Sequence, residues 1–375
     1  MKNNKILFFI GGSYVSGLEI VTLHLIKGLK EKGYNVHCVI SGWNNNDFKE
    51  RLELLSVPYY EIKLGWFYIK KIGWTIDSLI HYPKAYFKCK KIIKNFNPDV
   101  CHFCNFSVPI LIYPLIKTKS VLNLQESYMP TAKHMLIFRL LNKKISKFTA
   151  VSNHIVKVLE RLNIPATKIE LIYNGIPIPG IHKLNNNNSV SHIGIIGQVV
   201  AWKGHRNLIE AANKLVTHGV YNFKVLIYGN DSTNYGSELK KTIKQKGLES
   251  YFEWKGFVKN QADIYANCDI VVVPTLTGEP CSLTIIESMF QEKALIVSDR
   301  GGNPELVDNG ENGLIFKAEN PSDLYTCILK LITEDKYRDT LAFKAKEKAT
   351  LRFNYLRMTE QYMDVYKINK TKRIE

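Results

Sequence analysis

The sequence predicts an α/β protein with two Rossmann-like domains, each a doubly wound parallel sheet, facing one another across a cleft. Short apolar runs alternate with helix-length amphipathic segments through all 375 residues. The alternation is interrupted once, by a polar stretch, and then restarts in the same order. The chain also exceeds the length of one ordinary α/β core, which favours two domains.

The first domain is expected over residues 1–180. Its first strand is the run KILFFI at residues 5–10, and a Gly-rich turn, a helix over residues 17–32 and the strand VHCVI complete one βαβ unit. The apolar run ends after five residues, which is too short for a signal peptide. The other elements expected in this domain are strands at 100–103, 120–124 and 148–151 and a helix from about 83 to 96.

A linker is expected over residues 181–191, which include four consecutive asparagines. The second domain, residues 192–350, repeats the pattern with the strand-like runs HIGIIG, FKVLIYG, YFEWKGFV, DIVVVP, ALIVSD and GLIF, and with helices over 205–216 and 237–246. Residues 345–370 read as one amphipathic helix, and the C-terminal part of the chain, residues 351–375, is expected to return to the first domain. No run of 18 uninterrupted apolar residues occurs, so no membrane-spanning helix is predicted.

The net charge of +17 is concentrated in the first half of the chain. Residues 1–180 hold 25 Lys and Arg against 11 Asp and Glu, whereas residues 181–375 hold 26 against 23. Within the first half, residues 65–97 interleave lysines with Trp, Tyr and Phe, a combination that suits an anionic membrane surface. A solvated lysine-rich helix is the main alternative. Nucleic acid is disfavoured because only nine of the 51 basic residues are Arg.

The seven cysteines are odd in number and lie in apolar surroundings, which favours a reduced, cytoplasmic compartment. Cys101 and Cys104 have CxxC spacing, with His102 between them. This spacing permits redox or metal chemistry. No second CxxC or His pair completes a zinc site, so core cysteines are the favoured interpretation.

The turn after the first strand, GGSYVSGLE, excludes two common nucleotide sites. Gly12 and Gly17 have P-loop spacing, but Leu18 stands where the phosphate-binding lysine belongs. The turn is not GxGxxG, and no acidic residue follows the second strand to bind a ribose. An NTPase and a dinucleotide-dependent dehydrogenase are therefore disfavoured, and a small-residue loop that a ligand can approach remains.

A second candidate site lies at residues 274–294, where a helix is predicted to begin at Ser282 just after the strand DIVVVP. Free N–H groups at such a helix start attract anions, and Glu287 tilts back toward them. With Glu279 in the preceding loop, the two carboxylates suit sugar hydroxyls beside a phosphate. The alternative is that Glu279 only complements the helix dipole and that Glu287 is solvated.

These residues resemble those of a family 4 glycosyltransferase with the GT-B fold, over nearly the whole chain. The elements that carry the resemblance occur in the family's order: GG and SGLE, PDVCHF, FTAVS, ELIYNGI, GQVVAWKGH, VLIYG, WKGFV, the pair Glu279 and Glu287, VSDRGGNPELV and NGENGLIF.

The resemblance implies retaining transfer of a sugar from a nucleoside-diphosphate donor, with no cofactor and no metal in the site. It places the donor mainly in the C-terminal domain and the acceptor mainly in the N-terminal one. Glu287 matches the residue that holds the nucleotide ribose, Glu279 lies near the donor sugar, and Lys203 neutralises the diphosphate. The full donor-binding set that it implies is Gly12, Gly17, Gln198, Lys203, Gly256, Phe257, Val258, Ser282, Leu283, Thr284 and Glu287.

The chain departs from the family pattern at three places. Gln198 stands where many relatives have an arginine, so Arg206 is a candidate to supply the missing charge. Cys281-Ser282 replaces the usual Phe-Gly. Gln125 stands where the family commonly has a histidine, and because an amide cannot take a proton, His102 or Glu126 is a candidate for that role. The predicted catalytic set is therefore Glu279, Lys203, Gln125 and His102, with His102 as a core residue being the alternative.

The expected acceptor is a glycan or a lipid-linked sugar in bacterial surface polysaccharide synthesis, with the protein at the inner face of the plasma membrane. Two other functions stay open. A nucleotide-sugar epimerase of the same fold would share the cleft but has little use for a basic aromatic surface. A non-catalytic membrane or nucleic-acid binding protein accounts for the charge but not for the donor motifs.

Overall fold

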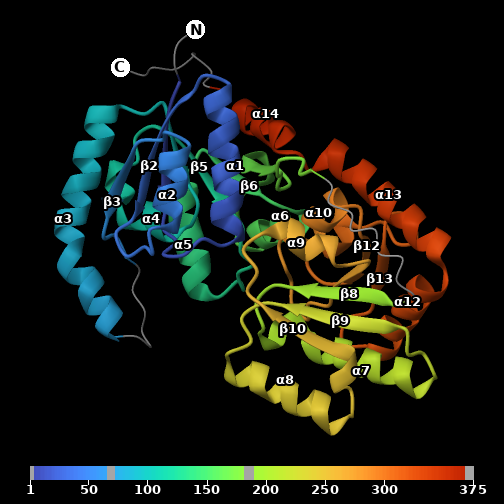
Figure 1. Cartoon of the computed structure of the whole chain (residues 1–375). Coiled ribbons are helices and arrows are strands. Elements are labelled where there is room, and N and C mark those ends of the chain that lie inside the picture. The colour runs from blue at the N-terminus through green and yellow to red at the C-terminus, as the bar shows by residue number, and fades with distance from the viewer. Residues whose placement is uncertain (1–3, 66–71, 181–189, 368–375) are drawn as a thin grey trace. The chain divides into compact units, whose positions relative to one another are not determined.

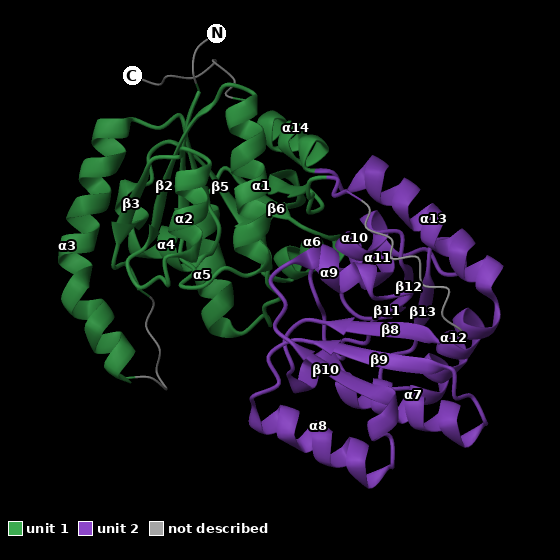
Figure 2. Ribbon diagram, viewed as in Figure 1, with its two compact units in different colours: residues 1–177, 355–375 green, residues 178–354 purple. Residues whose placement is uncertain are grey.

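The computed structural model describes residues 4–65, 72–180 and 190–367. These residues divide into two compact units (Figures 1 and 2). Unit 1 comprises Met1–Pro177 and Tyr355–Glu375, and unit 2 comprises Ile178–Asn354. The C-terminal segment thus groups with the N-terminal part of the chain. The expected asparagine-rich linker lies mostly outside the described residues.

Unit 1 contains a seven-stranded, entirely parallel sheet in the order β3-β2-β1-β4-β5-β6-β7. Its strands are β1 (Lys5–Ile10), β2 (Asn35–Ser41), β3 (Tyr59–Ile62), β4 (Val100–Phe103), β5 (Lys119–Leu124), β6 (Lys147–Ala150) and β7 (Ile169–Leu171). Its helices are α1 (Gly17–Glu31), α2 (Asp47–Leu54), α3 (Ile72–Phe96), α4 (Ser107–Leu111), α5 (Ala132–Asn142), α6 (Asn153–Arg161) and α14 (Tyr355–Tyr366), with the short 3-10 turns η1 (Tyr113–Leu115) and η2 (Ala166–Lys168).

Unit 2 contains a six-stranded parallel sheet in the order β10-β9-β8-β11-β12-β13. Its strands are β8 (Ser191–Ile196), β9 (Phe223–Tyr228), β10 (Phe252–Gly256), β11 (Ile270–Val273), β12 (Ala294–Ser298) and β13 (Leu314–Phe316). Its helices are α7 (His205–Thr217), α8 (Asn234–Gln245), α9 (Gln261–Ala266), α10 (Leu283–Phe290), α11 (Asn303–Leu306), α12 (Pro321–Thr333) and α13 (Asp335–Arg352), with the 3-10 turns η3 (Ala201–Lys203) and η4 (Glu249–Tyr251).

Both sheets reverse their strand order once, between β1 and β4 in unit 1 and between β8 and β11 in unit 2. At such a reversal, the loops that follow the two neighbouring strands run in opposite directions. Open α/β sheets bind ligands at this point, beside the carboxyl ends of the two strands. The two predicted Rossmann-like domains with parallel sheets are confirmed. The cleft that the sequence analysis expects between them stays a prediction.

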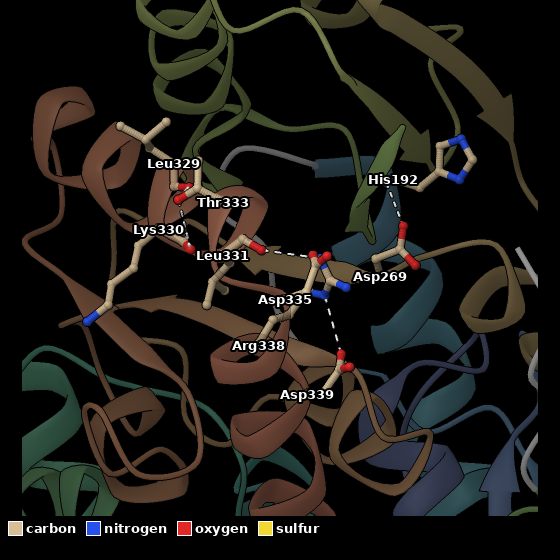
Figure 3. Close-up of polar contacts among 9 residues, drawn as sticks. All are labelled: His192, Asp269, Leu329, Lys330, Leu331, Thr333, Asp335, Arg338 and Asp339. Carbon is tan, nitrogen blue, oxygen red and sulfur yellow. Dashed lines mark hydrogen bonds and ion pairs between the residues drawn. The ribbon is translucent and has the colours of Figure 1, made fainter. Parts of the chain in front are cut away.

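Polar side chains bind backbone groups at the ends of several elements of unit 2 (Figure 3). Asp269, just before β11, accepts the backbone N–H of His192 in the neighbouring strand β8 at 2.8 Å. At the junction of α12 and α13, Arg338 Nη1 donates to the Leu331 carbonyl at 3.3 Å and to Asp335 Oδ1 at 2.7 Å. The bond to Leu331 satisfies one of the carbonyls that the end of α12 leaves without a partner.

Two helices differ from the sequence-based expectation. Helix α3 begins at Ile72 rather than near Pro83, which lies inside it. A proline inside a helix removes one backbone hydrogen bond, and here the helix continues through it. The single helix expected over residues 345–370 is two helices, because the chain leaves α13 at Phe353 and the Tyr355 N–H bonds to the Ile176 carbonyl at 3.0 Å.

Candidate functional site

Lys203 and Glu279 meet at the strand-order reversal of unit 2. Lys203 lies in the turn after β8, and Glu279 lies in the loop after β11, the strand next to β8. A backbone hydrogen bond of 2.8 Å from the Leu276 N–H to the Trp202 carbonyl joins the two loops. Between them Gly204, at φ +78°, leaves no room for a side chain, since a Cβ there would lie 1.8 Å from the Pro274 carbonyl oxygen. The sheet order and this close contact therefore bring two distant motifs together.

The two side chains form an ion pair that is mostly withdrawn from solvent. Lys203 Nζ donates to Glu279 Oε1 at 2.8 Å, with side-chain exposures of 16% and 13%. The ammonium also lies 4.4 Å from the centroid of the Trp202 ring. The second carboxylate oxygen of Glu279 is buried and accepts no hydrogen bond among the described residues. A buried acceptor without a donor costs free energy, so this oxygen is suited to receive a hydroxyl from a ligand.

The glycines after β12 support the backbone of Glu279. The Gly302 N–H donates to the Glu279 carbonyl at 2.8 Å. Gly301 has φ +61°, and a Cβ at that position would lie 2.3 Å from the Glu279 carbonyl oxygen. Only a residue without a side chain fits both the conformation and the space. Gly301 and Gly302 thus position the loop that carries Glu279.

The predicted helix start at Ser282 is confirmed, but the predicted cap bond is absent. Ser282 is the N-cap of α10, yet its hydroxyl makes no cap hydrogen bond and is buried without a partner among the described residues. The backbone N–H groups of Leu283, Thr284 and Ile285, in the first turn of α10, also have no backbone acceptor among the described residues. Unpaired donors at a helix start attract an anion. The turn therefore offers several free donors a few residues after Glu279, the partner of Lys203.

Glu287 lies in α10 and faces α9. Its carboxylate accepts a hydrogen bond from Gln261 Nε2 at 2.8 Å and one from the Tyr265 hydroxyl at 2.7 Å. Burial raises the pKa of Glu287 to about 7, although both of these hydrogen bonds favour the charged form. The sequence analysis did not identify Gln261 and Tyr265 as its partners. In the sequence, their position shortly before the strand DIVVVP was all that pointed to these two residues.

The other predicted donor residues of unit 2 lie at the same edge of the sheet. Gln198 is exposed in the turn after β8. Gly256 ends β10 with φ +64°, its carbonyl accepts the Gly229 N–H at 2.8 Å, and the Phe257 side chain that follows is 82% exposed. Val258 is partly buried. Arg206, the candidate to replace a missing arginine, instead pairs with Glu238 at 2.9 Å.

In unit 1, the small-residue turn packs against polar side chains. A Cβ on Gly12 would lie 2.1 Å from Glu19 Oε1, so the glycine lets the turn approach this buried carboxylate. Glu19 caps α1, accepting the Ser16 backbone N–H at 3.0 Å. Burial raises its pKa despite these hydrogen bonds. Gly17 is the first residue of α1 and is exposed.

His102 lies within β4 and Gln125 follows the neighbouring strand β5, but the two side chains differ in environment. His102 in β4 is 0% exposed, and its Nδ1 shares a 2.7 Å hydrogen bond with the Tyr366 hydroxyl of α14. Burial lowers the pKa of His102 to about 3. This placement favours the alternative interpretation, a core histidine. Gln125 is partly buried after β5, and its buried Nε2 has no partner among the described residues.

The described residues contain neither a cluster of metal ligands nor a helix that could span a membrane. No three His, Cys, Asp or Glu side chains in residues 4–65, 72–180 and 190–367 gather as metal ligands would. No helix within these ranges has the length and apolar character needed to cross a bilayer. The seven cysteines, Cys101 and Cys104 included, are free thiols, six of them buried.

Comparisons with known proteins agree with the folds of both units. A family model described as "Glycosyltransferase Family 4" matches residues 15–178, and one described as "Glycosyl transferases group 1" matches residues 181–348. Among curated relatives, the uncharacterized glycosyltransferase MJ1178 of Methanocaldococcus jannaschii is 26% identical over 89% of this chain and 90% of its own length. MJ1069 of the same organism is 24% identical over 61% of this chain, and the match spans only 60% of its length.

A solved structure supports the fold independently. Anabaena Alr3699/HepE, crystallised with UDP and glucose, has a TM-score of 0.79 at 20% identity and matches 96% of this chain and 99% of its own. The two family models together span most of both units, and this structural likeness extends over the whole architecture. The chain belongs to the family 4 glycosyltransferases, enzymes of the GT-B fold.

Proposed function

We propose that the protein is a retaining glycosyltransferase that moves a sugar from a nucleoside-diphosphate sugar to a glycan or lipid-linked acceptor. The observation that carries this proposal is the Lys203–Glu279 ion pair beside the uncapped start of α10. A diphosphate would accept from the free N–H groups and from Lys203, which would exchange part of its bond to Glu279 for the phosphate. The charge that develops on the departing diphosphate would then face a fixed cation.

Glu279 and Glu287 have separate roles in this proposal. The free Oε2 of Glu279 receives a hydroxyl of the donor sugar. Glu287, whose ionised form is already held by Gln261 and Tyr265, receives the ribose hydroxyls with its remaining lone pairs. Gln125, with a buried and unpaired amide nitrogen in unit 1, is proposed to bind the acceptor or the donor sugar.

A bacterial polysaccharide context is supported by the names of relatives. One relative, from Campylobacter jejuni, is an N-acetylgalactosaminyltransferase named for a diphospho-undecaprenol acceptor, and it is 24% identical over 62% of this chain. Another is the capsular polysaccharide glycosyltransferase CapM of Staphylococcus aureus, which is 27% identical over 49% of this chain. A cytoplasmic enzyme that meets such an acceptor at the inner membrane face would fit both.

The reaction is tested by incubating the protein with a panel of nucleotide sugars and lipid-linked sugar acceptors, and following the products by mass spectrometry and NMR. The proposal expects a glycosylated acceptor, a free nucleoside diphosphate, and an anomeric configuration equal to that of the donor. An inverted anomer would refute the retaining mechanism. An epimerised nucleotide sugar with no transfer would show that the protein is an epimerase instead.

A further inference from the structure

Large apolar side chains are exposed along one helix of unit 1 that the proposed reaction does not use. Helix α3 spans 25 residues and is the long helix of this unit in Figure 1. Of the 19 exposed large apolar side chains in the described part of the chain, six lie on it. They are Ile72 (69% exposed), Trp74 (59%), Ile76 (51%), Leu79 (54%), Ile80 (69%) and Phe87 (63%). So many exposed apolar side chains on one helix indicate an interaction surface.

The helical period divides α3 into two faces. Its buried side chains are Ser78, Ala85, Cys89, Ile92 and Phe96, a stripe that repeats every three or four residues. Ile76, Ile80 and Phe87 lie on the opposite side of the helix. These three side chains and Ile72 therefore form a second, outward stripe, whereas Trp74 lies one turn before Ser78 on the buried side.

The outward stripe changes character along its length. Apolar residues occupy it from Ile72 to Phe87, and Lys90 and Lys94 continue it to the end of the helix, with Lys91 beside them. These three lysines are exposed and make no ion pair among the described residues. The one acidic residue of the helix is Asp77, and its Oδ1 lies 3.2 Å from Nδ1 of His81. The positive charge of the C-terminal half is thus not neutralised within the helix.

We propose that α3 docks this protein on an anionic bilayer, with its apolar N-terminal half in the interface and its lysines on the acidic headgroups. An apolar stripe of this kind inserts shallowly at the boundary between headgroups and acyl chains, and lysines near that boundary are attracted by anionic lipid. The lengthwise separation of the two kinds of residue tilts the helix, with the Ile72 end deeper. The excess of basic residues in residues 1–180 orients the same unit toward the membrane.

Helix α5 supplies a second contact of the same chemistry. Its buried face carries Ile137, Phe138 and Leu141, while Leu136 is 59% and Leu140 39% exposed. The same outward side holds the exposed Arg139, and no acidic residue occurs in this helix. From β3 onward the chain crosses the sheet in one direction, to β4, β5, β6 and then β7. Because such connections are right-handed, α3, which follows β3, and α5, which follows β5, lie on the same face of the sheet. The two outward stripes can therefore meet one surface.

The test is sedimentation of the full chain with vesicles of phosphatidylcholine alone or with about a third phosphatidylglycerol. The proposal expects binding to the anionic vesicles that weakens with salt. Replacing Lys90, Lys91 and Lys94 by Gln is expected to lower the partition coefficient on the order of a hundredfold. Ile76→Glu with Ile80→Glu is expected to abolish binding. Lys241→Gln with Lys244→Gln, two exposed lysines of α8 without ion pairs, is the matched control and leaves binding unchanged.

Binding that neither the α3 lysine variant nor the α3 isoleucine variant changes would overturn the proposal, as would the absence of binding. A dimer in solution that the isoleucine variant dissociates, without vesicle binding, would assign the stripe to a second copy of the chain instead. Far-UV circular dichroism and thermal unfolding, compared with the wild type, show whether each variant is folded. The proposed donor site lies in unit 2 and α3 lies in unit 1, so vesicle docking and the proposed transfer reaction can fail independently.

Discussion

The raised pKa of Glu287 means that its proposed role, binding the ribose, should make the donor affinity depend on pH near neutrality. Its raised pKa, about 7, means that it is mostly protonated at about pH 6 and mostly ionised at about pH 8. Only the ionised form offers every lone pair to hydroxyl donors. The affinity for a nucleotide sugar, whose diphosphate does not titrate in this range, is expected to fall as the pH drops below 7, by up to about tenfold per unit.

Calorimetric titrations across this range check the expectation, with Glu287→Gln as the comparison. The variant should bind more weakly at high pH and show no pH dependence near 7. A wild-type affinity that is constant with pH would contradict the ribose role. For stability the sign is opposite: the native state holds this proton more tightly than the unfolded chain, so the contribution is present below the ordinary glutamate pKa and is lost as the pH rises through 7.

The Lys203–Glu279 pair predicts a coupled loss of stability and of donor binding. Lys203→Ala leaves the Glu279 carboxylate with little solvent and no cation, which should lower the free energy of unfolding by about 2 kcal/mol. It should also weaken nucleoside-diphosphate binding by about tenfold to a hundredfold. Scanning calorimetry and titration calorimetry measure the two effects. In the double variant with Glu279→Ala, most of the stability should return but not the affinity; equal stability of both variants would refute the coupling.

At the level of elements, the loop after β12 sets the position of Glu279. Gly301→Ala adds a methyl group at φ +61° and about 2 Å from the Glu279 backbone, so the loop must move. We expect a loss of about 1 to 3 kcal/mol in stability together with weaker donor binding. Gly310→Ala is the matched control, because Gly310 has φ +81° but only the Tyr337 hydroxyl at 3.7 Å nearby.

The control should cost stability through its backbone conformation and leave donor binding unchanged. Thermal unfolding and titration calorimetry on both variants separate the two effects. If Gly301→Ala kept full affinity, the glycine would have only a turn-forming role.

Helix α14 is held to the sheet of unit 1 by buried hydroxyls. Tyr366 bonds to His102 Nδ1 at 2.7 Å, and Tyr362 bonds to the Thr149 hydroxyl at 3.1 Å. Tyr366→Phe should lower the free energy of unfolding by about 1 to 2 kcal/mol, because His102 then keeps two buried nitrogens without a partner. Denaturant unfolding measures this loss. A fall in the transfer rate without a loss of stability would instead support a catalytic role for His102.

For the whole molecule, the sequence predicted every strand of unit 2, including the edge strands β10 and β13, but in unit 1 it predicted the central strands better than the edges. Strands β1, β4 and β11 are buried along nearly their whole length and lie where they were expected. The edge strands β3 and β7 were not predicted, because their side chains are only partly buried and their patterns are short. The extension of α3 before Pro83 was missed because proline usually marks a helix start.

The sequence predicted those residues of the candidate site that belong to local motifs, but not the contacts between distant motifs. Lys203, Glu279 and Glu287 follow from spacing and resemblance, but the ion pair between the first two depends on β8 and β11 being neighbours in the sheet. The burial of His102 under α14 arises from a contact 264 residues apart in sequence. Such contacts are set by topology, which the order of apolar runs does not determine.

The most direct test of the account is titration calorimetry of the full chain with a panel of nucleoside diphosphates. The account predicts that at least one binds, that Lys203→Ala and Glu287→Gln each weaken it by about tenfold or more, and that Lys241→Gln with Lys244→Gln does not. If no member of the panel bound, or if Lys203→Ala and Glu287→Gln both bound like the wild type, the donor site assigned to unit 2 would be wrong.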